Sequence, residues 1–340
     1  MQSYTGVDIG TSSIKLVKVQ SGNVIRVITA LHAPITKNLL TSDNPKDQEE
    51  LANALRKIMH EGQISQKEVA LALPESQVFT RVIDMPALTE QEVASALNWQ
   101  AEQYIPLPLS EVNLDFSIIH RPTDTKDKMK VLLIAAPVKV INRYSKILEL
   151  SGLTASFLET EIVAYTRIFK NQALSGNALL AIDWGFNTTD VGIIADGAVL
   201  FTHSIPVGGD ALSRAIAEAF SFQYPQAEEY KKTYGLDINQ LQGNVQKTLR
   251  PVIDSILGEL KKSMAFYDQK FSIPIKSVMV LGGGALMPGL VSYVAESLSL
   301  EVQIANPWES YQLDPSINAI KSLSSFYSIA TGLSLRELIE

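Results

Sequence analysis

The chain has 340 residues, of which 46% are hydrophobic and 19% are charged, a balance too apolar for a disordered protein. Its 29 basic and 36 acidic residues leave a net charge of −7, and no basic tract interrupts the sequence, so no nucleic-acid-binding surface is expected. The absence of cysteine excludes disulfides, thiolate metal sites and cysteine nucleophiles, and it fits a reducing cytoplasm.

The length is about twice that of a typical domain, so we expect two compact lobes. The N-terminus lacks the basic and apolar regions of a secretory signal. The longest apolar stretches, such as Val131–Val138, are about half as long as a membrane span requires. We therefore expect a soluble protein that associates with a membrane only through its partners.

The first part of the chain has the pattern of a strand meander followed by a helix. Two strands, Thr5–Ile9 and Ile14–Gln20, flank a turn of glycine and hydroxyl residues, and Val24–Leu31 forms a third strand. Apolar residues at helical spacing predict an amphipathic helix over Asp47–Glu61, and Val69–Leu73 predicts a short buried strand.

The following residues predict a small insert with its own sheet, in the order β-α-β-β-α-β. A capping box formed by Thr89 and Glu92 opens its first helix. The other expected elements are the strands Gln77–Asp84, Val112–Ile119, Lys130–Ala136 and Thr154–Leu158, with a second helix over Lys139–Leu150.

A second copy of the opening pattern begins at residue 178. The strand Ala178–Asp183 runs into Asp183-Trp184-Gly185, just as the first strand runs into Asp8-Ile9-Gly10. A hydroxyl-rich turn, another strand and a tight turn follow in both copies. Asp8 and Asp183 are 175 positions apart, which is too long a period for a solenoid. The duplication predicts two similar α/β lobes that face each other.

The last third of the chain predicts mostly helices, with one more strand, Ser277–Leu281, that runs into Gly282-Gly283-Gly284. Pro251 either kinks the longest of these helices or marks a late start. The expected helices are one from Gly208-Gly209-Asp210 to Phe220, and then Gln226–Thr233, Val245–Phe271, Met287–Leu298 and Phe326–Leu338.

Asp8 and Asp183 each end an apolar strand, where a carboxylate is costly unless it is paired or holds a cation. Two such groups, one from each lobe, suit a hydrated Mg²⁺ ion, which takes one or two carboxylates together with water and phosphate oxygens. The alternative is that each aspartate caps its own turn. The matched pair favours the metal site.

The two turns that follow these aspartates have the composition of phosphate-binding loops. Gly10 and Gly185 allow a close approach of the backbone, and Lys15 either neutralises a phosphate or is an ordinary solvent-facing strand residue. The candidate hydrogen-bond donors are Thr11, Ser12 and Ser13 in the first turn and Asn187, Thr188 and Thr189 in the second.

Three further groups are candidates for nucleotide contacts. The turn Gly282-Gly283-Gly284 either accepts a flat base or ribose or is a tight buried turn. Gly208, Gly209 and Asp210 begin a helix whose free N–H groups would bind an anion. Glu229 and Lys232 either hold a ribose or purine edge or form a solvated ion pair, and Glu161 either orients an attacking water or is a helix-start carboxylate.

Taken in this order, the two Asp-x-Gly hairpins, the triple-glycine turn and the closing helix resemble the actin-like ATPase superfamily. The resemblance places the two phosphate motifs at Val7–Val19 and Ala181–Ile193 and the two connecting helices at Glu159–Phe169 and Phe326–Arg336. It places the adenosine motif, with Met287, at Val278–Leu290. It implies an α/β fold in which two duplicated lobes surround a cleft for ATP and Mg²⁺.

The segment ALNWQAEQYIPLP at 96–108, together with Leu132–Val138 and Ala330–Arg336, resembles the PilM family of type IV pilus assembly proteins. Similarity to FtsA is weaker, because that family usually extends to an amphipathic membrane-binding tail, whereas this chain ends at Glu340. The PilM resemblance implies an inserted α+β, SHS2-like subdomain at 84–157. It assigns 1–83, 158–180 and 322–340 to the first lobe and 181–321 to the second, with 209–275 as the helical subdomain of the second lobe.

The resemblance implies a cytoplasmic ATP-binding component of the pilus machine, peripheral to the inner membrane through its partners. The implied partners are the cytoplasmic N-terminal segment of PilN, other platform proteins and, by self-association, further copies of the chain. Phe186 replaces a residue that is small elsewhere in the superfamily, so at most slow hydrolysis of ATP is expected. The alternatives are an FtsA-like cell-division protein and a small-molecule kinase, although a kinase needs an acceptor-site carboxylate base that the first lobe does not show.

Overall fold

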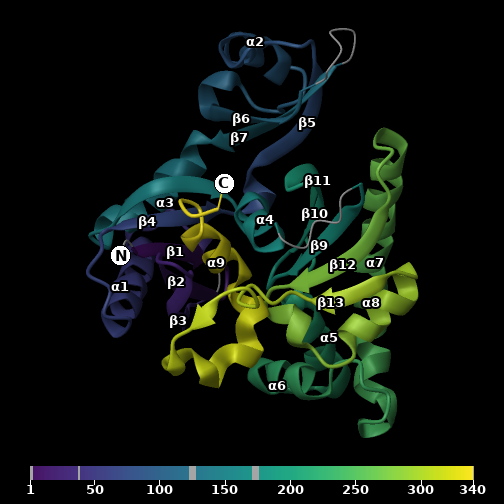
Figure 1. The fold of residues 1–340 in the computed structure, drawn as a ribbon. Coiled ribbons are helices and arrows are strands. Elements are labelled where there is room, and N and C mark those ends of the chain that lie inside the picture. Colours follow the sequence, from purple (N-terminus) through teal and green to yellow (C-terminus); the bar gives the residue numbers. More distant parts are fainter. Residues whose placement is uncertain (1–2, 37–38, 122–127, 171–175, 340) are drawn as a thin grey trace.

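The structure is a computed structural model that describes residues 3–36, 39–121, 128–170 and 176–339. Within these residues the strands form three sheets of six, five and three strands. Figure 1 shows the two larger sheets side by side and the smallest sheet standing apart from them at the top of the view. We call the parts built on these sheets the first lobe, the second lobe and the insert.

The first lobe contains the six-stranded sheet in the order β14-β3-β2-β1-β4-β8. Its strands are β1 (Ser3–Ile9), β2 (Ser13–Gln20), β3 (Arg26–Pro34), β4 (Glu68–Leu73), β8 (Thr154–Thr160) and β14 (Gln312–Leu313). Alternate residues of β2 point to opposite faces, as expected for a strand buried on both sides. Leu16 packs with helices α1 (Pro45–Glu61) and α3 (Val138–Leu150), whereas Val17 packs with α9 (Ser328–Ser334).

The insert consists of β5 (Phe79–Met85), α2 (Glu90–Ala101), β6 (Val112–His120) and β7 (Met129–Pro137), with its sheet in the order β5-β7-β6. The expected capping box is present: Glu92 N donates to Thr89 Oγ1, and Thr89 N donates to Glu92 Oε2. Apolar side chains from α2 and from all three strands share one core. The insert therefore has a hydrophobic centre of its own.

The predicted extent of the insert, residues 84–157, is wrong at both ends: β5 of the small sheet already begins at Phe79, and the last predicted strand lies outside this sheet. Strand β8 is not part of the small sheet but pairs in parallel with β4, from Glu68 opposite Thr154 to Leu73 opposite Thr160. Helix α3 follows β7 directly and packs with α1 in the core of the first lobe. Two parallel neighbouring strands need a crossover connection, and α3 provides it, so β4, α3 and β8 form a β-α-β unit of the first lobe. The predicted order β-α-β-β-α-β did not show to which sheet its last strand belongs.

The second lobe contains the five-stranded sheet in the order β11-β10-β9-β12-β13. The strands are β9 (Ala178–Trp184), β10 (Thr189–Ala195), β11 (Ala198–Ile205), β12 (Ile275–Leu281) and β13 (Glu301–Ile304). Its first four strands repeat the order β3-β2-β1-β4 of the first lobe, with an antiparallel meander beside a parallel strand in both. The predicted duplication is confirmed at the level of topology. The short strands β13 and β14 were not predicted.

The helices of the second lobe are α5 (Gly209–Phe220), α6 (Tyr224–Tyr234), α7 (Asn244–Lys270) and α8 (Leu290–Leu298). Pro251 lies inside α7, which begins seven residues earlier at Asn244, so the proline does not mark the start of the helix. The predicted last helix, Phe326–Leu338, is shorter in the structure: α9 covers only Ser328–Ser334 and follows a long 3-10 segment, Pro315–Tyr327.

Helix α4 (Glu161–Thr166) joins the two lobes and lies between their sheets, as Figure 1 shows. It packs closely on α9: a methyl group at Gly332 would lie 2.0 Å from the Ala164 carbonyl oxygen, so this crossing requires glycine. No helix in the described part of the chain is long and apolar enough to cross a membrane.

Candidate nucleotide-binding site

The two duplicated hairpins close in the same way. Gly10 N donates to the Ser13 carbonyl oxygen at 3.0 Å, and Gly185 N donates to the Thr188 carbonyl oxygen at 3.0 Å. A methyl group at Gly185 would lie 2.9 Å from that same Thr188 oxygen, so the second turn is too tight for a side chain there. The matching hydrogen bonds show that the sequence repeat is also a repeat of local geometry.

In the first hairpin the aspartate is already paired. Asp8 on β1 is 2% exposed, and its cross-strand neighbour on β2 is Lys15, whose Nζ lies 3.0 Å from Asp8 Oδ2. Burial alone would lower the pKa of Lys15, but the charges of Asp8, Asp183 and Glu161 and the hydrogen bond to Asp8 raise it overall. Lys15 also lies over the Phe326 ring, 5.0 Å from its centroid. Lys15 is therefore a permanent cation of the site and not a solvent-facing strand residue.

In the second hairpin an aspartate faces another aspartate. Asp183 on β9 is 6% exposed, and its cross-strand neighbour on β10 is Asp190, which is 4% exposed. Burial raises the pKa of Asp183 to about 7, with the charges of Asp190 and Asp8 adding to this effect and Lys15 opposing it. Asp190 accepts a hydrogen bond from Thr188 Oγ1 at 2.7 Å, and burial raises its pKa as well. Sequence reasoning missed Asp190, although its position opposite Asp183 in a hairpin was a readable signal.

The fold brings the two hairpins to one place. Asp183 acts electrostatically on Lys15, and Asp8 acts on Asp183, although the two aspartates are 175 positions apart in the sequence. Glu161 is the first residue of α4. Burial, together with the negative charges of Asp190, Asp8 and Asp183, raises the pKa of its carboxyl group well above the usual value. Glu161 Oε2 accepts a hydrogen bond from Glu75 N at 3.0 Å. One cation, Lys15, is thus close to three acidic side chains, Asp8, Asp183 and Glu161.

The triple-glycine turn packs directly on the second hairpin. Gly282 has φ +80°, a left-handed conformation, and a methyl group there would lie 2.3 Å from Asp183 Oδ1. A methyl group at Gly284 would lie 2.4 Å from Trp184 Cδ1, whereas Gly283 is exposed. Met287 follows, buried, at the end of a short 3-10 helix. This turn therefore presents bare backbone beside Asp183, at a distance that no other residue type would permit.

The candidate hydrogen-bond donors differ in what they are free to do. Thr188 Oγ1 donates to Asp190 and Thr189 Oγ1 donates to the Val207 carbonyl oxygen, so these two hydroxyl groups stabilise the hairpin itself. Asn187 is exposed at the tip of the second turn, and Thr11 and Ser12 are partly buried in the first. Ser13 Oγ is buried without a hydrogen-bond partner. An unsatisfied hydroxyl at this point fits a site that is completed by a polar ligand.

The first N–H groups of α5 are not free for an anion, contrary to the sequence prediction. Gly209 N donates to the Gly185 carbonyl oxygen at 3.0 Å and Asp210 N donates to the Phe186 carbonyl oxygen at 2.8 Å. A methyl group at Gly208 would lie 2.7 Å from that Phe186 oxygen. Asp210 itself accepts from Tyr224 Oη at 2.7 Å and pairs with Arg214. The start of α5 thus stabilises the second turn by hydrogen bonds to its carbonyl oxygens.

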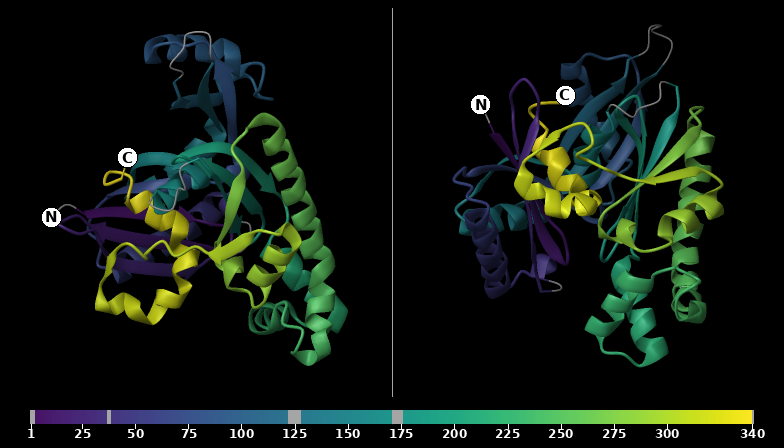
Figure 2. Two further views of the ribbon diagram at one scale, coloured as in Figure 1. Left: turned by 45° about the vertical axis from the view of Figure 1, so that its right-hand side comes forward. Right: turned by 60° about the horizontal axis from the view of Figure 1, so that its bottom comes forward.

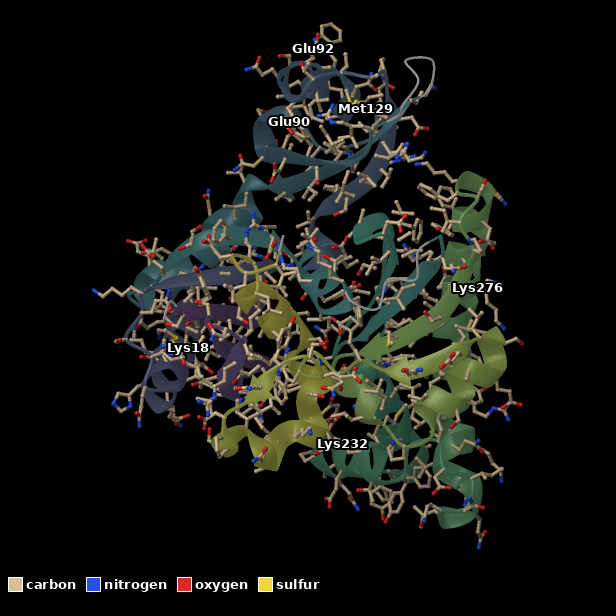
Figure 3. The ribbon with its side chains drawn as sticks, viewed as in Figure 1. Lys18, Glu90, Glu92, Met129, Lys232 and Lys276 are labelled. Carbon is tan, nitrogen blue, oxygen red and sulfur yellow. The ribbon has the colours of Figure 1, made fainter. Side chains whose placement is uncertain are left out.

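Glu229 and Lys232 lie exposed on α6, and Figure 3 shows Lys232 at the lower edge of the molecule. They are not paired with each other: Lys232 Nζ lies 3.1 Å from Glu228 Oε1. The buried ion pair of this helix is Glu228 with Lys231, whose Nζ also donates to the Gly209 carbonyl oxygen at 2.9 Å. The predicted residues, Glu229 and Lys232, are the sequence neighbours of this buried pair. A spacing of three residues does not tell which face of the helix is buried.

The residues at the centre fit a nucleotide with a divalent cation. Asp8 and Asp183 carry carboxylate oxygens in opposite lobes, Lys15 carries a positive charge beside them, and the glycine turns present bare backbone, which are the groups that a phosphate and its cation would require. Because burial and the charge of Asp190 raise the pKa of Asp183 to about 7, a nearby cation would favour its charged form. Among the described residues, no group of three or more histidine, aspartate or glutamate side chains is arranged to hold a metal ion by itself.

A family model described as "Type IV pilus assembly protein PilM" matches residues 6–338, so the chain belongs to this family. The solved structure described as "PilM-PilN type IV pilus biogenesis complex" matches with a TM-score of 0.88 at 26% sequence identity, covering 99% of both chains.

More distant proteins share the fold. The ethanolamine utilization protein EutJ of Carboxydothermus hydrogenoformans matches with a TM-score of 0.60 at 19% identity, covering 98% of this chain and 90% of that one. MreB5 of Spiroplasma citri, solved with AMPPNP, matches with a TM-score of 0.55 at 15% identity, covering 99% and 96%. The cell division protein FtsA of Streptococcus pneumoniae is 22% identical over 374 residues, covering 98% of this chain and 81% of that protein. The fold is that of the actin-like ATPases: two duplicated α/β lobes with an α+β insert in the first.

Proposed function

We propose that this protein is the ATP-binding component of a type IV pilus assembly platform, and that nucleotide binding in the cleft controls how it holds its partner. The observation that carries the proposal is the meeting of the two acidic hairpins around Lys15, because ATP with Mg²⁺ matches their charges. Membership of the pilus assembly family supplies the cellular process.

Each part of the site has a role in this proposal. Asp8 and Asp183 hold Mg²⁺ through water, and Lys15 neutralises a β- or γ-phosphate. The turn Gly282–Gly284 and Met287 support the adenosine. When it is bound, the Mg²⁺ ion supplies positive charge that screens the phosphates and stabilises Asp183 as a carboxylate. Binding of Mg–ATP by residues from both lobes would favour a closed cleft over an open one.

Glu161 is the candidate for orienting an attacking water. Burial and the nearby charges of Asp190, Asp8 and Asp183 raise the pKa of its carboxyl group, which disfavours the charged form that a general base requires. The bulky Phe186 in the second turn adds a further departure from its superfamily. Both features favour slow hydrolysis, so the protein acts mainly by binding nucleotide and not by rapid turnover.

The proposed partner is the short cytoplasmic N-terminal segment of PilN, since a solved structure that resembles this chain along its whole length with a TM-score of 0.88 is described as a PilM–PilN complex. The insert is the part of the fold that such a role would use, because it is absent from actin and sugar kinases. Other proteins of the inner-membrane platform and further copies of this chain are additional partners in this proposal, and contact with the membrane is indirect.

The test is a titration of the purified protein with the PilN cytoplasmic peptide, followed by calorimetry or fluorescence anisotropy, with and without Mg–ATP. We expect binding whose affinity differs between the two states, and no binding of a peptide of the same composition in shuffled order. Absence of binding in both states would reject the platform function. It would favour the alternative of an FtsA-like cell-division protein, which the sequence similarity to FtsA supports.

A further inference from the structure

The insert contacts the second lobe as well as the first lobe from which it emerges. Val82 on β5 and Leu132 on β7 are 3% and 4% exposed, and both belong to the same apolar core as the strands of the second lobe. The left view of Figure 2 shows the upper end of α7 beside the strands of the insert. The insert is therefore not attached only by its two chain connections.

A lysine of the second lobe is bonded to the backbone of the insert. Lys270, the last residue of α7, donates from Nζ to the Val82 carbonyl oxygen at 2.6 Å. Strand β5 is an edge strand of its sheet, so alternate carbonyl groups are left without a partner in the ladder. A charged donor to such a carbonyl makes one of the stronger kinds of hydrogen bond.

An aromatic ring beside this bond contacts a cation of the insert. Phe271 is buried, and its ring centroid lies 5.1 Å from Lys130 Nζ of β7 and 5.5 Å from Lys270 Nζ. Lys130 is oriented by Asp84 of β5, whose Oδ1 lies 3.0 Å from Lys130 Nζ. The Phe271 ring is itself stacked on Tyr267 of α7 at 5.0 Å. Cation–π contacts of this kind add to the stability of partly buried interfaces.

From these contacts we infer that Lys270 and Phe271 form a latch that holds the insert on the second lobe. The insert is continuous in sequence with the first lobe, because β7 runs directly into α3, yet its edge strand is bonded to the end of α7. A change in the angle between the lobes must then change the position of the insert relative to the first lobe. The latch converts opening or closing of the cleft into movement of the insert.

This inference rests on the proposed function in one respect only, namely that nucleotide closes the cleft. If it does, the latch is the physical connection by which the nucleotide state reaches a partner held by the insert. Without the latch, only apolar contacts such as those of Val82 and Leu132 would hold the insert on the second lobe, and partner affinity would depend less on nucleotide.

The test uses the absence of cysteine, since two introduced cysteines are then the only thiols available for spin labels. Ser95 on α2 and Ser255 on α7 are both exposed and report the distance between the insert and the second lobe. When both cysteines of Ser95→Cys/Ser255→Cys protein carry spin labels, pulsed electron–electron double resonance measures the distance between the labels. Without nucleotide, we expect one narrow distribution of this distance. Lys270→Ala should broaden it at least about twofold, and Phe271→Leu, which keeps an apolar side chain, should broaden it to a smaller extent.

The matched control is Lys262→Ala, because Lys262 is an exposed lysine on the same helix that pairs only within α7, with Glu259 at 2.7 Å. This variant should leave the distribution unchanged. A distribution in Lys270→Ala protein as narrow as in the parent would overturn the latch. Failure of the proposed function has a different signature: Mg–ATP would then not alter the distance between labels at Lys57 and Ser255, which lie in opposite lobes.

Discussion

The two Asp-x-Gly hairpins are copies of each other in backbone but opposites in charge. Both join β-strands in the same topology, and both close with a glycine N–H bonded to a carbonyl oxygen three residues later. In the first hairpin the residue opposite the aspartate is Lys15, whereas in the second it is Asp190. A duplicated fold thus needs the glycine and the strand pattern to be retained, but it leaves the cross-strand partner free to change.

This difference in the cross-strand partner shows which hairpin has its charge neutralised without a ligand. The Asp8–Lys15 pair is neutral and hydrogen-bonded as it stands. Asp183 and Asp190 face each other in a buried position, and burial raises the pKa of both. Like charges at such a position are avoided by taking up a proton or a cation. We therefore expect the first hairpin to contribute stability and the second to contribute the gain in free energy when Mg–ATP binds.

The largest effect is expected when the second hairpin loses its carboxylate. Asp183→Ala removes an oxygen ligand that the phosphate-bound cation needs, and we expect affinity for Mg–ATP to fall about 1,000-fold, which corresponds to about 4 kcal/mol. Titration of a fluorescent ATP analogue in the presence of Mg²⁺ measures this change. Without nucleotide, the same substitution should not lower the melting temperature, because it removes a buried charge.

The control for this substitution is Asp268→Ala, an exposed carboxylate on α7 outside the cleft. It should bind Mg–ATP like the parent protein. If Asp183→Ala protein keeps the parent affinity, the hairpins do not form the metal site and the assignment of the cleft is wrong.

A change in the first hairpin should act mainly on stability. Lys15→Met keeps most of the side-chain volume but leaves Asp8 buried without its cation, and breaking such a pair costs about 3 kcal/mol. Chemical denaturation should report this loss in the free energy of unfolding at pH 8. Asp8→Asn/Lys15→Met protein, in which neither charge remains, should recover part of it. If the single substitution destabilises the protein no more than Lys18→Met on the same strand, the pair is not the stabilising element of the hairpin.

Much of the fold could be predicted because it depends on local patterns. Alternating and helical apolar spacing located most strands and helices, and the repeat of Asp8-Ile9-Gly10 in Asp183-Trp184-Gly185 indicated the duplicated lobes. The exceptions have a common cause. The pairing of β8 with β4 is a contact between residues far apart in the sequence, and the two-residue strand β14 is too short for any periodicity.

The candidate site was predictable to the same extent. Glycines and aspartates at strand ends could be found from their order, and the place of Asp190 opposite Asp183 could have been read from the predicted hairpin. The contact between Glu75 and Glu161 could not, because it forms only when distant parts of the chain come together. The start of α5 shows the opposite error: its N–H groups were expected to face a ligand, but they are used by the carbonyl oxygens of the second turn. Spacing reveals which groups are present, but not which of them already have partners.

The smallest expected effect is the pH dependence that Asp183 of the second hairpin contributes. Asp183 has a usual pKa of 3.8, and its pKa in the folded protein is about 7, so between these values the folded protein binds a proton that the unfolded chain has lost. The free energy of unfolding therefore falls as pH rises from about 4 to about 7, and the full penalty is present above pH 7. Asp183→Asn cannot ionise. It should be more stable than the parent at pH 8, and the advantage should shrink as the pH is lowered to 5.

We expect the two proteins to differ in this pH dependence by about 1 to 2 kcal/mol, less than the full shift implies, because the nearby carboxyl groups of Asp190 and Glu161 also have raised pKa values and compete for the proton. Denaturation at several pH values without nucleotide measures the difference. Saturating Mg–ATP should remove it from the parent protein, since the cation then takes the place of the proton at Asp183. A parent protein whose stability is independent of pH between 5 and 8 would mean that the second hairpin is as well neutralised as the first, and the contrast between the two copies would be lost.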